Sequence, residues 1–297
     1  MDRDDQVIEA AISEKGMAQL TPDEFEDALL DLVSPWLSDE RDLLVVASGM
    51  VGAKQGWREA PYISVPCVPA QDVTFAPTKH ARLRVAILPG VSQSEPADVM
   101  RGEETQVLGF LDQFPVFSGV ICLPGTHSKW VRIAGGKIVE FQAFVTGELY
   151  AAICAHTVLR HSLTGSGWRQ SAFQDAVDDT LSAPEATAAA LFRIRAEDLL
   201  RGTTPDIGQA RLSGTLIGFE LNAARRFWER ERVVLLGSPD LCARYASALD
   251  RMGTRASTAD IDACTLAGLK AAHKTLLQGS KSATPINPET ICEEHDT

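Results

Sequence analysis

The chain has 297 residues, 45% of them hydrophobic, and a net charge of −12 at pH 7. This length and apolar content allow one large hydrophobic core or two smaller ones, so we expect a globular protein. The acidic balance excludes a nucleic-acid groove or an anionic membrane surface as the partner, because each needs a basic face. A protein that binds a small molecule is favoured.

Cysteine usage and the N-terminal sequence both indicate a cytoplasmic protein. The six cysteines are widely spaced, form no C-x-x-C pair and fall mostly in apolar segments, which is typical of reduced core residues. The N-terminus, MDRDDQ, is acidic where a signal peptide is basic, and no apolar run approaches the ~20 residues of a membrane span.

The N-terminal part predicts a strand, a helix and a second strand. Val7 to Ile12 is a short strand candidate. In the helix, Thr21 is the N-cap, Pro22 takes the first helical position and Glu24 completes a capping box. The apolar run Leu43 to Ala47 then predicts a buried strand.

A glycine-rich loop, SGMVGAKQGWREAPY, follows that strand. Ligands of open α/β sheets bind at the carboxyl ends of strands, so this loop is a candidate ligand site. Arg58 could bind a carboxylate through two parallel hydrogen bonds, and Trp57 could pack a carbon chain. Lys54 and Gln55 complete the candidate set. A solvated loop with one buried tryptophan explains the same residues equally well.

Two glutamates open the next predicted helix, within the sequence MRGEE. Acidic residues in a first helical turn complement the helix dipole by ~0.3 to 1 kcal/mol, which suffices to explain Glu103 and Glu104. A catalytic carboxylate is the alternative. Residue types alone leave both explanations open.

Residues Val120 to Glu148 predict three strands joined by two turns, the first Pro-Gly-Thr and the second Gly-Gly. The first turn can direct successive N–H groups into one concavity beside Thr126, Ser128 and Lys129. Such a concavity suits phosphate oxygens, although an ordinary hairpin turn is the simpler interpretation.

The remaining sequence is mostly helical. Helices are predicted at Leu149–His161, Glu185–Leu200, Thr215–Arg232, Asp240–Met252 and Asp260–Leu277. The third has an apolar stripe of Leu216, Phe219, Ala223 and Phe227. The buried strand Val233 to Leu236 turns at Gly237 and Ser238, a second candidate nucleotide contact that lacks G-x-G-x-x-G. Beyond Gly279 we expect disorder. No histidine has metal-ligand spacing.

Several blocks resemble the signature blocks of one family: SGMVGAKQGWREAPY, ILPGVSQ with DVMRGEETQVLG, LPGTHSKWV with FVTGELYA, LSGTLIGFEL, and LLGSPDLCARYASAL. The residues of these blocks and their order along the chain are similar to those of the 2-dehydro-3-deoxygalactonokinase family. That family resembles the sugar kinase/actin/heat-shock ATPase superfamily. The resemblance implies an α/β fold of two ribonuclease-H-like domains around a nucleotide cleft. It also implies transfer of the ATP γ-phosphate, with Mg²⁺, to the 6-hydroxyl of 2-dehydro-3-deoxy-D-galactonate in galactonate catabolism.

The resemblance implies roles and boundaries as well. Gly125, Thr126, Ser128 and Lys129 would hold the nucleotide phosphates, Gly237 and Ser238 the adenosine, Lys54, Gln55, Trp57 and Arg58 the sugar acid, and Glu104, with Glu103 next, would be the catalytic base. Residues 1–118 would form the first domain, completed by a helix at 260–278, and 119–259 the second, with a tail at 280–297. The metal ligands, the sugar-acid epimer and a homodimer are left open.

One departure from the family pattern concerns the N-terminus. Family members begin with a strand and an Asp-x-Gly-Thr turn that binds phosphate, whereas this chain begins with MDRDDQVIEA, about where a third strand is expected. We therefore expect an N-terminally incomplete first domain with an exposed sheet edge, and an upstream in-frame segment that encodes the hairpin. The alternative is a catalytically silent sugar-acid-binding or regulatory protein on the same fold. A nucleotide-binding dehydrogenase is a third, weaker hypothesis, because the fingerprint is absent.

Overall fold

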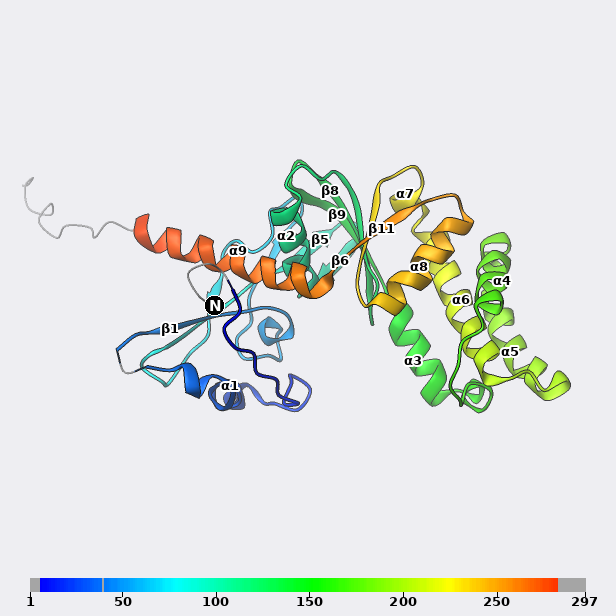
Figure 1. Ribbon diagram of the computed structural model, residues 1–297, viewed down its shortest axis with the longest axis horizontal. Helices are drawn as coiled ribbons and strands as arrows, with labels where there is room; N and C mark the ends of the chain where they lie inside the picture. Colours follow the sequence, from blue (N-terminus) through cyan, green and yellow to red (C-terminus); the bar gives the residue numbers. More distant parts are fainter. Residues whose placement is uncertain (1–5, 39, 283–297) are drawn as a thin grey trace, which may run out of the picture.

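The computed structural model describes residues 6–38 and 40–282 and shows an elongated α/β molecule (Figure 1). A three-stranded sheet with α1 lies at one end, a five-stranded sheet in the middle and a group of helices at the other end. The predicted α/β class is confirmed. Within the described ranges, no helix is both long and apolar enough to cross a membrane.

The N-terminal sheet has the order β1-β4-β3, with β1 (Leu43–Ala47) parallel to β4 (Leu83–Ile87) and β3 (Thr74–Phe75) antiparallel to β4. Helix α1 (Phe25–Val33) packs on it through an apolar cluster. The capping box before α1 is confirmed, since both the backbone N–H and the hydroxyl of Thr21 donate to Glu24 at 2.8 Å.

The strand predicted at Val7–Ile12 is wrong. These residues form no strand and their side chains are exposed, Ile12 by 95%. A strand needs a partner for its backbone hydrogen bonds, and none of the described sheets includes this segment. In the described part of the chain, β1 pairs with β4 alone and so forms a sheet edge.

A second three-stranded sheet, which the sequence analysis did not predict, contains β2 (Tyr62–Ser64), β5 (Gly90–Ser94) and β6 (Ala97–Met100). It is joined to the edge of the central sheet by side chains. The Phe141 N–H donates to Gln93 Oε1 at 3.0 Å, and the Ala143 N–H donates to Asp98 Oδ2 at 2.6 Å. The two sheets therefore share one hydrophobic cluster.

The central sheet has the strand order β11-β10-β7-β8-β9. Strands β7 (Gly119–Leu123), β8 (Ser128–Ala134) and β9 (Lys137–Phe144) are antiparallel, and β10 (Val233–Leu236) and β11 (Ala256–Ala259) extend the sheet in parallel from β7. Three antiparallel strands followed by two parallel ones agree with the ribonuclease-H-like topology predicted for this segment.

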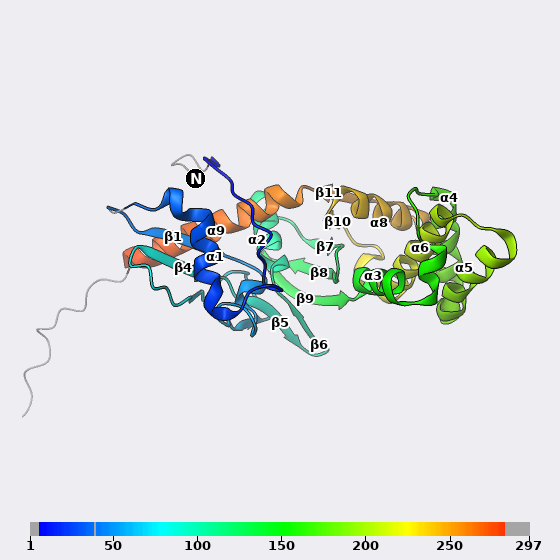
Figure 2. The ribbon, with the colours of Figure 1, turned by 90° about the horizontal axis from the view of Figure 1, so that it is seen from below.

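Helices cover both faces of the central sheet (Figure 2). One face packs against α4 (Gln170–Ser182), α6 (Pro205–Ala223), α7 (Arg225–Trp228) and α8 (Pro239–Arg251), with α3 (Thr146–His156) and α5 (Thr187–Arg201) beyond them. The other packs against α2 (Glu103–Gln113) and the start of α9 (Ile261–Ser282). Helix α4 was not predicted, because most of its residues are polar and its short apolar face, which includes Ala172, Phe173 and Val177, gives a weak periodic pattern.

The predicted stripe on the helix that contains Leu216 is partly wrong. Helix α6 begins ten residues earlier than predicted, at Pro205, and Phe219 is 47% exposed whereas the neighbouring Glu220 is buried. The sequence periodicity predicted that Phe219 would lie in the core. Glu220 is buried in its place, because hydrogen-bond donors surround its carboxylate.

Helices α2 and α9 touch backbone to backbone. A Cβ atom on Gly109 would lie 1.8 Å from the Cys264 carbonyl oxygen, and one on Gly268 would lie 2.0 Å from that of Thr105. Only glycine fits at either position.

Candidate active site

A pocket of about 510 Å³ opens beside the turn between β7 and β8. Three of the residues predicted to contact nucleotide, Gly125, Thr126 and Ser238, line it together. The remaining lining comes from α3, α6 and α8 and consists of Thr146, Gly147, Tyr150, Ser213, Leu216, Ile217, Leu241, Arg244 and Tyr245, together with Pro124 of the turn. Four segments distant in sequence thus build one cavity.

Two glycines, Gly147 and Gly237, allow neighbouring segments to approach the turn closely. A Cβ on Gly147 would lie 2.3 Å from the Gly125 carbonyl oxygen, and one on Gly237 would lie 3.0 Å from the Pro124 carbonyl oxygen. A Cβ on Gly125 itself would meet nothing within 4 Å, so there is open space beside this residue of the pocket lining. This arrangement leaves room for a ligand directly against the backbone.

The pocket is lined by both apolar and hydroxyl-bearing residues. Leu216, Ile217 and Leu241 are among its apolar lining residues, and several hydroxyl residues and the cation Arg244 are among its polar ones. Such a lining accommodates a flat, weakly polar ring at one side and an anionic, hydrogen-bonding group at the other.

Ser128 and Lys129, the other two predicted phosphate contacts, do not line this pocket. Ser128 is fully buried, with its Oγ atom 2.9 Å from the Tyr245 hydroxyl. The Lys129 side chain points the opposite way, because successive strand residues alternate between faces. Its Nζ atom donates to the His127 carbonyl oxygen at 3.2 Å and lies 3.2 Å from Glu103 Oε1.

The predicted catalytic carboxylates lie at the N-terminus of α2. Glu104 is fully buried and accepts a 2.7 Å hydrogen bond from the Gly102 N–H. Burial, with a smaller contribution from the neighbouring Glu103 charge, raises the pKa of Glu104 to about 8. Glu103, a quarter exposed, accepts from the Arg101 N–H at 3.1 Å and pairs with Lys129.

The predicted sugar loop begins next to these carboxylates. Ser48 Oγ lies 2.5 Å from Thr105 Oγ1, and a Cβ on Gly102 would lie 3.4 Å from the Cα of Gly49. Further along, Lys54, Gln55 and Arg58 are exposed. Trp57 packs in the core instead, stacked on Phe25 with 6.2 Å between ring centroids.

Arg101 is a further residue of this region that was not among the predicted site residues. Its guanidinium lies 4.3 Å from the centre of the Tyr62 ring, and its Nη2 donates to the Ala60 carbonyl oxygen at 2.8 Å. It connects the sugar loop to the start of α2. A basic residue directly before a helix is disfavoured by the positive N-terminal end of the helix dipole. Its presence before Glu103 and Glu104 was therefore a sequence signal that could have identified it.

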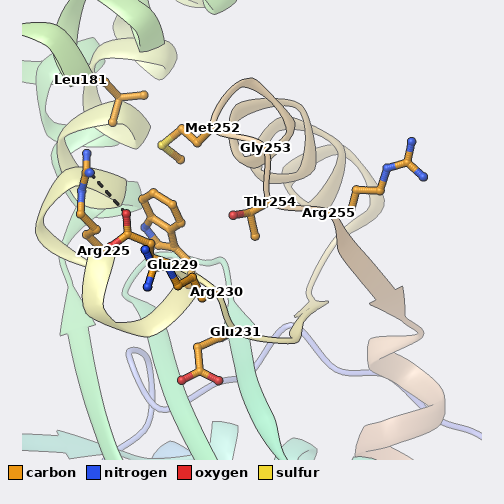
Figure 3. Close-up of a pocket in the computed structure, with 10 residues that line it drawn as sticks. Leu181, Arg225, Glu229, Arg230, Glu231, Met252, Gly253, Thr254 and Arg255 are labelled. Atoms are coloured by element: carbon orange, nitrogen blue, oxygen red, sulfur yellow. Dashed lines mark ion pairs between the residues drawn. The ribbon is translucent and has the colours of Figure 1, made fainter.

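A second pocket, of about 430 Å³, lies between α7 and the connection from α8 to β11 (Figure 3). It contains none of the predicted site residues. Arg225 pairs with Glu229 at 3.6 Å, and Arg255 points away from the other lining residues. Across the part of the chain that the structure describes, no three His, Cys, Asp or Glu side chains gather as a metal site.

Comparison with known proteins identifies the family. A model of the 2-keto-3-deoxy-galactonokinase family matches residues 1–272. The chain belongs to this family. Among its relatives, the probable 2-dehydro-3-deoxygalactonokinase of Rhizobium meliloti (strain 1021) is 40% identical over 79% of each chain, and the 2-dehydro-3-deoxygalactonokinase of Escherichia coli (strain K12) is 33% identical over 90% of each.

A solved structure agrees with this family membership. The crystal structure of a candidate 2-dehydro-3-deoxygalactonokinase from Sinorhizobium meliloti is 37% identical, covers 86% of this chain and 85% of its own, and superposes with a TM-score of 0.78. The resemblance inferred from the sequence blocks is therefore confirmed.

Proposed function

We propose that this chain is a sugar-acid kinase that transfers the γ-phosphoryl group of ATP to the 6-hydroxyl of 2-dehydro-3-deoxy-D-galactonate. The names of the family and of both relatives support this activity. The structural observation that carries the proposal is the contact between Lys129 and Glu103, because it joins the turn beside the pocket to the helix that presents the carboxylates. This contact supports placing the proposed phosphate donor site beside the proposed acceptor site.

The pocket is the proposed ATP site. The open turn at Gly125 and Thr126 offers backbone N–H groups and a hydroxyl to the phosphates, and the wall of Leu216, Ile217 and Leu241 is suited to the adenine ring. Ser238, at the N-terminus of α8, would meet the adenosine. The volume and mixed lining fit a nucleotide.

Mg²⁺ neutralises charge on the transferred phosphoryl group in kinases. It usually keeps several waters and binds through substrate phosphates and one or two carboxylates, so it needs no dedicated protein cage. The described residues fit this mode, since they contain no three-residue metal cluster but place Glu103 beside the turn. Glu103 is the proposed protein contact.

The carboxylates at the start of α2 are the proposed acceptor-side machinery. The acceptor hydroxyl loses its proton as its oxygen bonds to phosphorus, and Glu104 is the proposed base for that proton. A pKa near 8 gives Glu104 the basicity that this role needs. Lys54, Gln55 and Arg58 are the proposed sugar-acid contacts, with the Arg58 guanidinium facing the carboxylate.

Release of ADP, coupled to a spectroscopic assay, tests the activity over a panel of 3-deoxy-2-keto sugar acids. We expect turnover to be highest with the galactonate-derived epimer. Binding of the sugar acid in calorimetry without ADP release would favour the catalytically silent alternative. The cytoplasm, where ATP is supplied, is the proposed location, and a homodimer is a prediction that sedimentation would test.

A further inference from the structure

Glu220, on α6, is a buried carboxylate that the proposed reaction does not yet use. It is 1% exposed and lies directly beneath the pocket, since two of its hydrogen-bond partners, Thr146 and Tyr245, belong to the pocket lining. A charge taken out of water at this depth persists only with several donors around it.

Three donors converge on this carboxylate from three other elements. Trp130 Nε1 of β8 donates to Oε1 at 2.8 Å, the Tyr245 hydroxyl of α8 donates to Oε2 at 2.7 Å, and the Thr146 hydroxyl of α3 donates to Oε2. Ser128 follows one step behind, 2.9 Å from the Tyr245 oxygen. Burial raises the pKa of Glu220, and these hydrogen bonds oppose that shift.

The direction of each proton in this network is set by the partners. In the charged form of Glu220, which these hydrogen bonds favour, the carboxylate only accepts, so the protons of Trp130, Thr146 and Tyr245 all point at it. The Ser128 hydroxyl is left as a donor, either to the Tyr245 oxygen at 2.9 Å or to Glu220 itself. Thr146 is part of the pocket lining and has consequently no hydroxyl proton left to offer a ligand there.

Thr146 lies next to the proposed phosphate site. The residue after it, Gly147, packs against the Gly125 carbonyl, and the N–H of Glu148 donates to the Thr126 carbonyl oxygen at 2.9 Å. An acceptor oxygen at this place repels phosphate oxygens but binds an O–H group.

We propose that Glu220 is a positioning residue that keeps the Thr146 proton out of the pocket, so that the Thr146 oxygen accepts a hydrogen bond from an O–H donor of the bound nucleotide. That donor is a ribose hydroxyl or a water carried by the nucleotide's metal ion. The inference rests on the proposed ATP site.

Glu220→Gln tests this without changing the side-chain size. Because Trp130 needs an acceptor, the Gln carbonyl must face it, and the Gln NH₂ then donates to Thr146 and Tyr245. The Thr146 proton is displaced toward the pocket, where it opposes the nucleotide's own O–H. The expected loss of ADP affinity is about tenfold or more, as for a hydrogen bond that leaves buried groups unpaired.

The experiment is calorimetric titration of ADP with Mg²⁺ into the full chain and its Glu220→Gln, Thr146→Val, Thr146→Ser and Glu220→Gln/Thr146→Val variants. Thr146→Val should weaken ADP about as much as Glu220→Gln, Thr146→Ser should bind within about threefold of the wild type, and the double variant should bind no more weakly than Thr146→Val alone. Kinetically, the Michaelis constant for ATP should rise while that for the sugar acid stays unchanged.

Glu26→Gln is a matched control, because Glu26 is also a buried carboxylate, 5% exposed, but accepts from the Lys79 and His80 N–H groups far from the pocket. It should leave ADP affinity unchanged. Losses that add fully in the double variant, or wild-type affinity in Glu220→Gln, would overturn the inference.

A second series of titrations, with the wild type and Thr146→Val, identifies the O–H group that donates to Thr146. The penalty of this variant should disappear with 2′-deoxy-ADP or 3′-deoxy-ADP if the donor is a ribose hydroxyl, or with ADP in EDTA if it is a metal-bound water. A penalty that persists with every one of these ligands contradicts the inference. Absence of ADP binding in the wild type would instead refute the proposed ATP site itself.

Discussion

The Nζ atom of Lys129 lies 3.2 Å from Oε1 of Glu103, and this ion pair connects strand β8 to the first turn of α2. The lysine is almost fully buried, so solvent screens the pair only weakly. The predicted phosphate residue and the predicted acidic residue thus contact each other directly. Each holds the other at the boundary between the proposed donor and acceptor sites.

Lys129→Met should lower turnover by up to about 100-fold, because a misplacement of about 1 Å at a reacting centre has an effect of that size. The Michaelis constant for ATP should change less, since Lys129 does not line the pocket. Steady-state kinetics measures both. Lys129→Arg keeps the charge beside Glu103 and should retain more turnover than Lys129→Met, and equal losses in the two variants would mean that the ion pair does not matter for the reaction.

Glu104→Gln should reduce turnover by ~10²- to 10⁴-fold while sugar-acid binding, measured by calorimetry, stays close to that of the wild type. The amide keeps the side-chain shape but cannot take the acceptor proton. Glu103→Gln is the comparison. If that variant is the inactive one, Glu103 is the base, and if both variants stay active, the carboxylates only cap the helix.

The raised pKa of Glu104 makes two quantities depend on pH. The ratio kcat/KM should rise with pH and level off above about pH 8, where the base has lost its proton. Arg101 lowers this pKa and Glu103 raises it, so Arg101→Met should move the profile to higher pH and Glu103→Gln should move it to lower pH.

Stability should change in the opposite direction. The folded state binds the Glu104 proton up to about pH 8 and the unfolded state only up to about 4.5, so the free energy of unfolding falls as pH rises between these values. The loss is at most about 5 kcal/mol at 1.36 kcal/mol per pKa unit. Urea unfolding should therefore find Glu104→Gln more stable than the wild type at pH 8.5, with the difference shrinking at pH 5.

Thr126→Val should raise the Michaelis constant for ATP about tenfold, because it removes a hydroxyl that lines the pocket. Ser128→Ala should mainly lower stability, by roughly 1 to 2 kcal/mol, since its hydroxyl bonds to buried Tyr245. ATP kinetics and thermal unfolding separate the two effects. A larger ATP defect in Ser128→Ala would restore Ser128 as a direct phosphate contact.

Arg58→Met should raise the Michaelis constant for the sugar acid by roughly 10- to 100-fold with little effect on ATP, as expected for a lost charge-assisted hydrogen bond. Arg82→Met is the control, because Arg82 is another exposed arginine of the N-terminal part and pairs with Asp42. An equal defect with a neutral sugar analogue would show that Arg58 acts structurally.

Local signals in the sequence were accurate where one residue type fixes the backbone. The Thr21–Glu24 capping box, the start of α2 after Gly102 and the Gly135-Gly136 turn all appear as expected. The strand after the first turn was also predicted, yet the orientation of Ser128 was not. If the predicted start of a strand is wrong by one residue, every side chain is assigned to the wrong face of the sheet.

Long-range packing was the part that sequence could not supply. Trp57 was equally suited to a ligand or to the core, and only the contact with Phe25 decides. Glu220 was overlooked because a glutamate on a helix is normally exposed. Its hydrogen-bond donors come from β8, α3 and α8, so the sequence of α6 alone cannot indicate them.

The glycine contacts between α2 and α9 also bear on how the protein is made. Gly109 leaves the ribosome long before Gly268, so during synthesis the face of the central sheet beneath α2 lacks the helix that completes its cover. Folding of this half must wait until nearly the whole chain has been translated, and the nascent protein meanwhile exposes apolar surface to chaperones. Shortening the chain before Ile261 should therefore yield aggregates rather than a smaller folded protein.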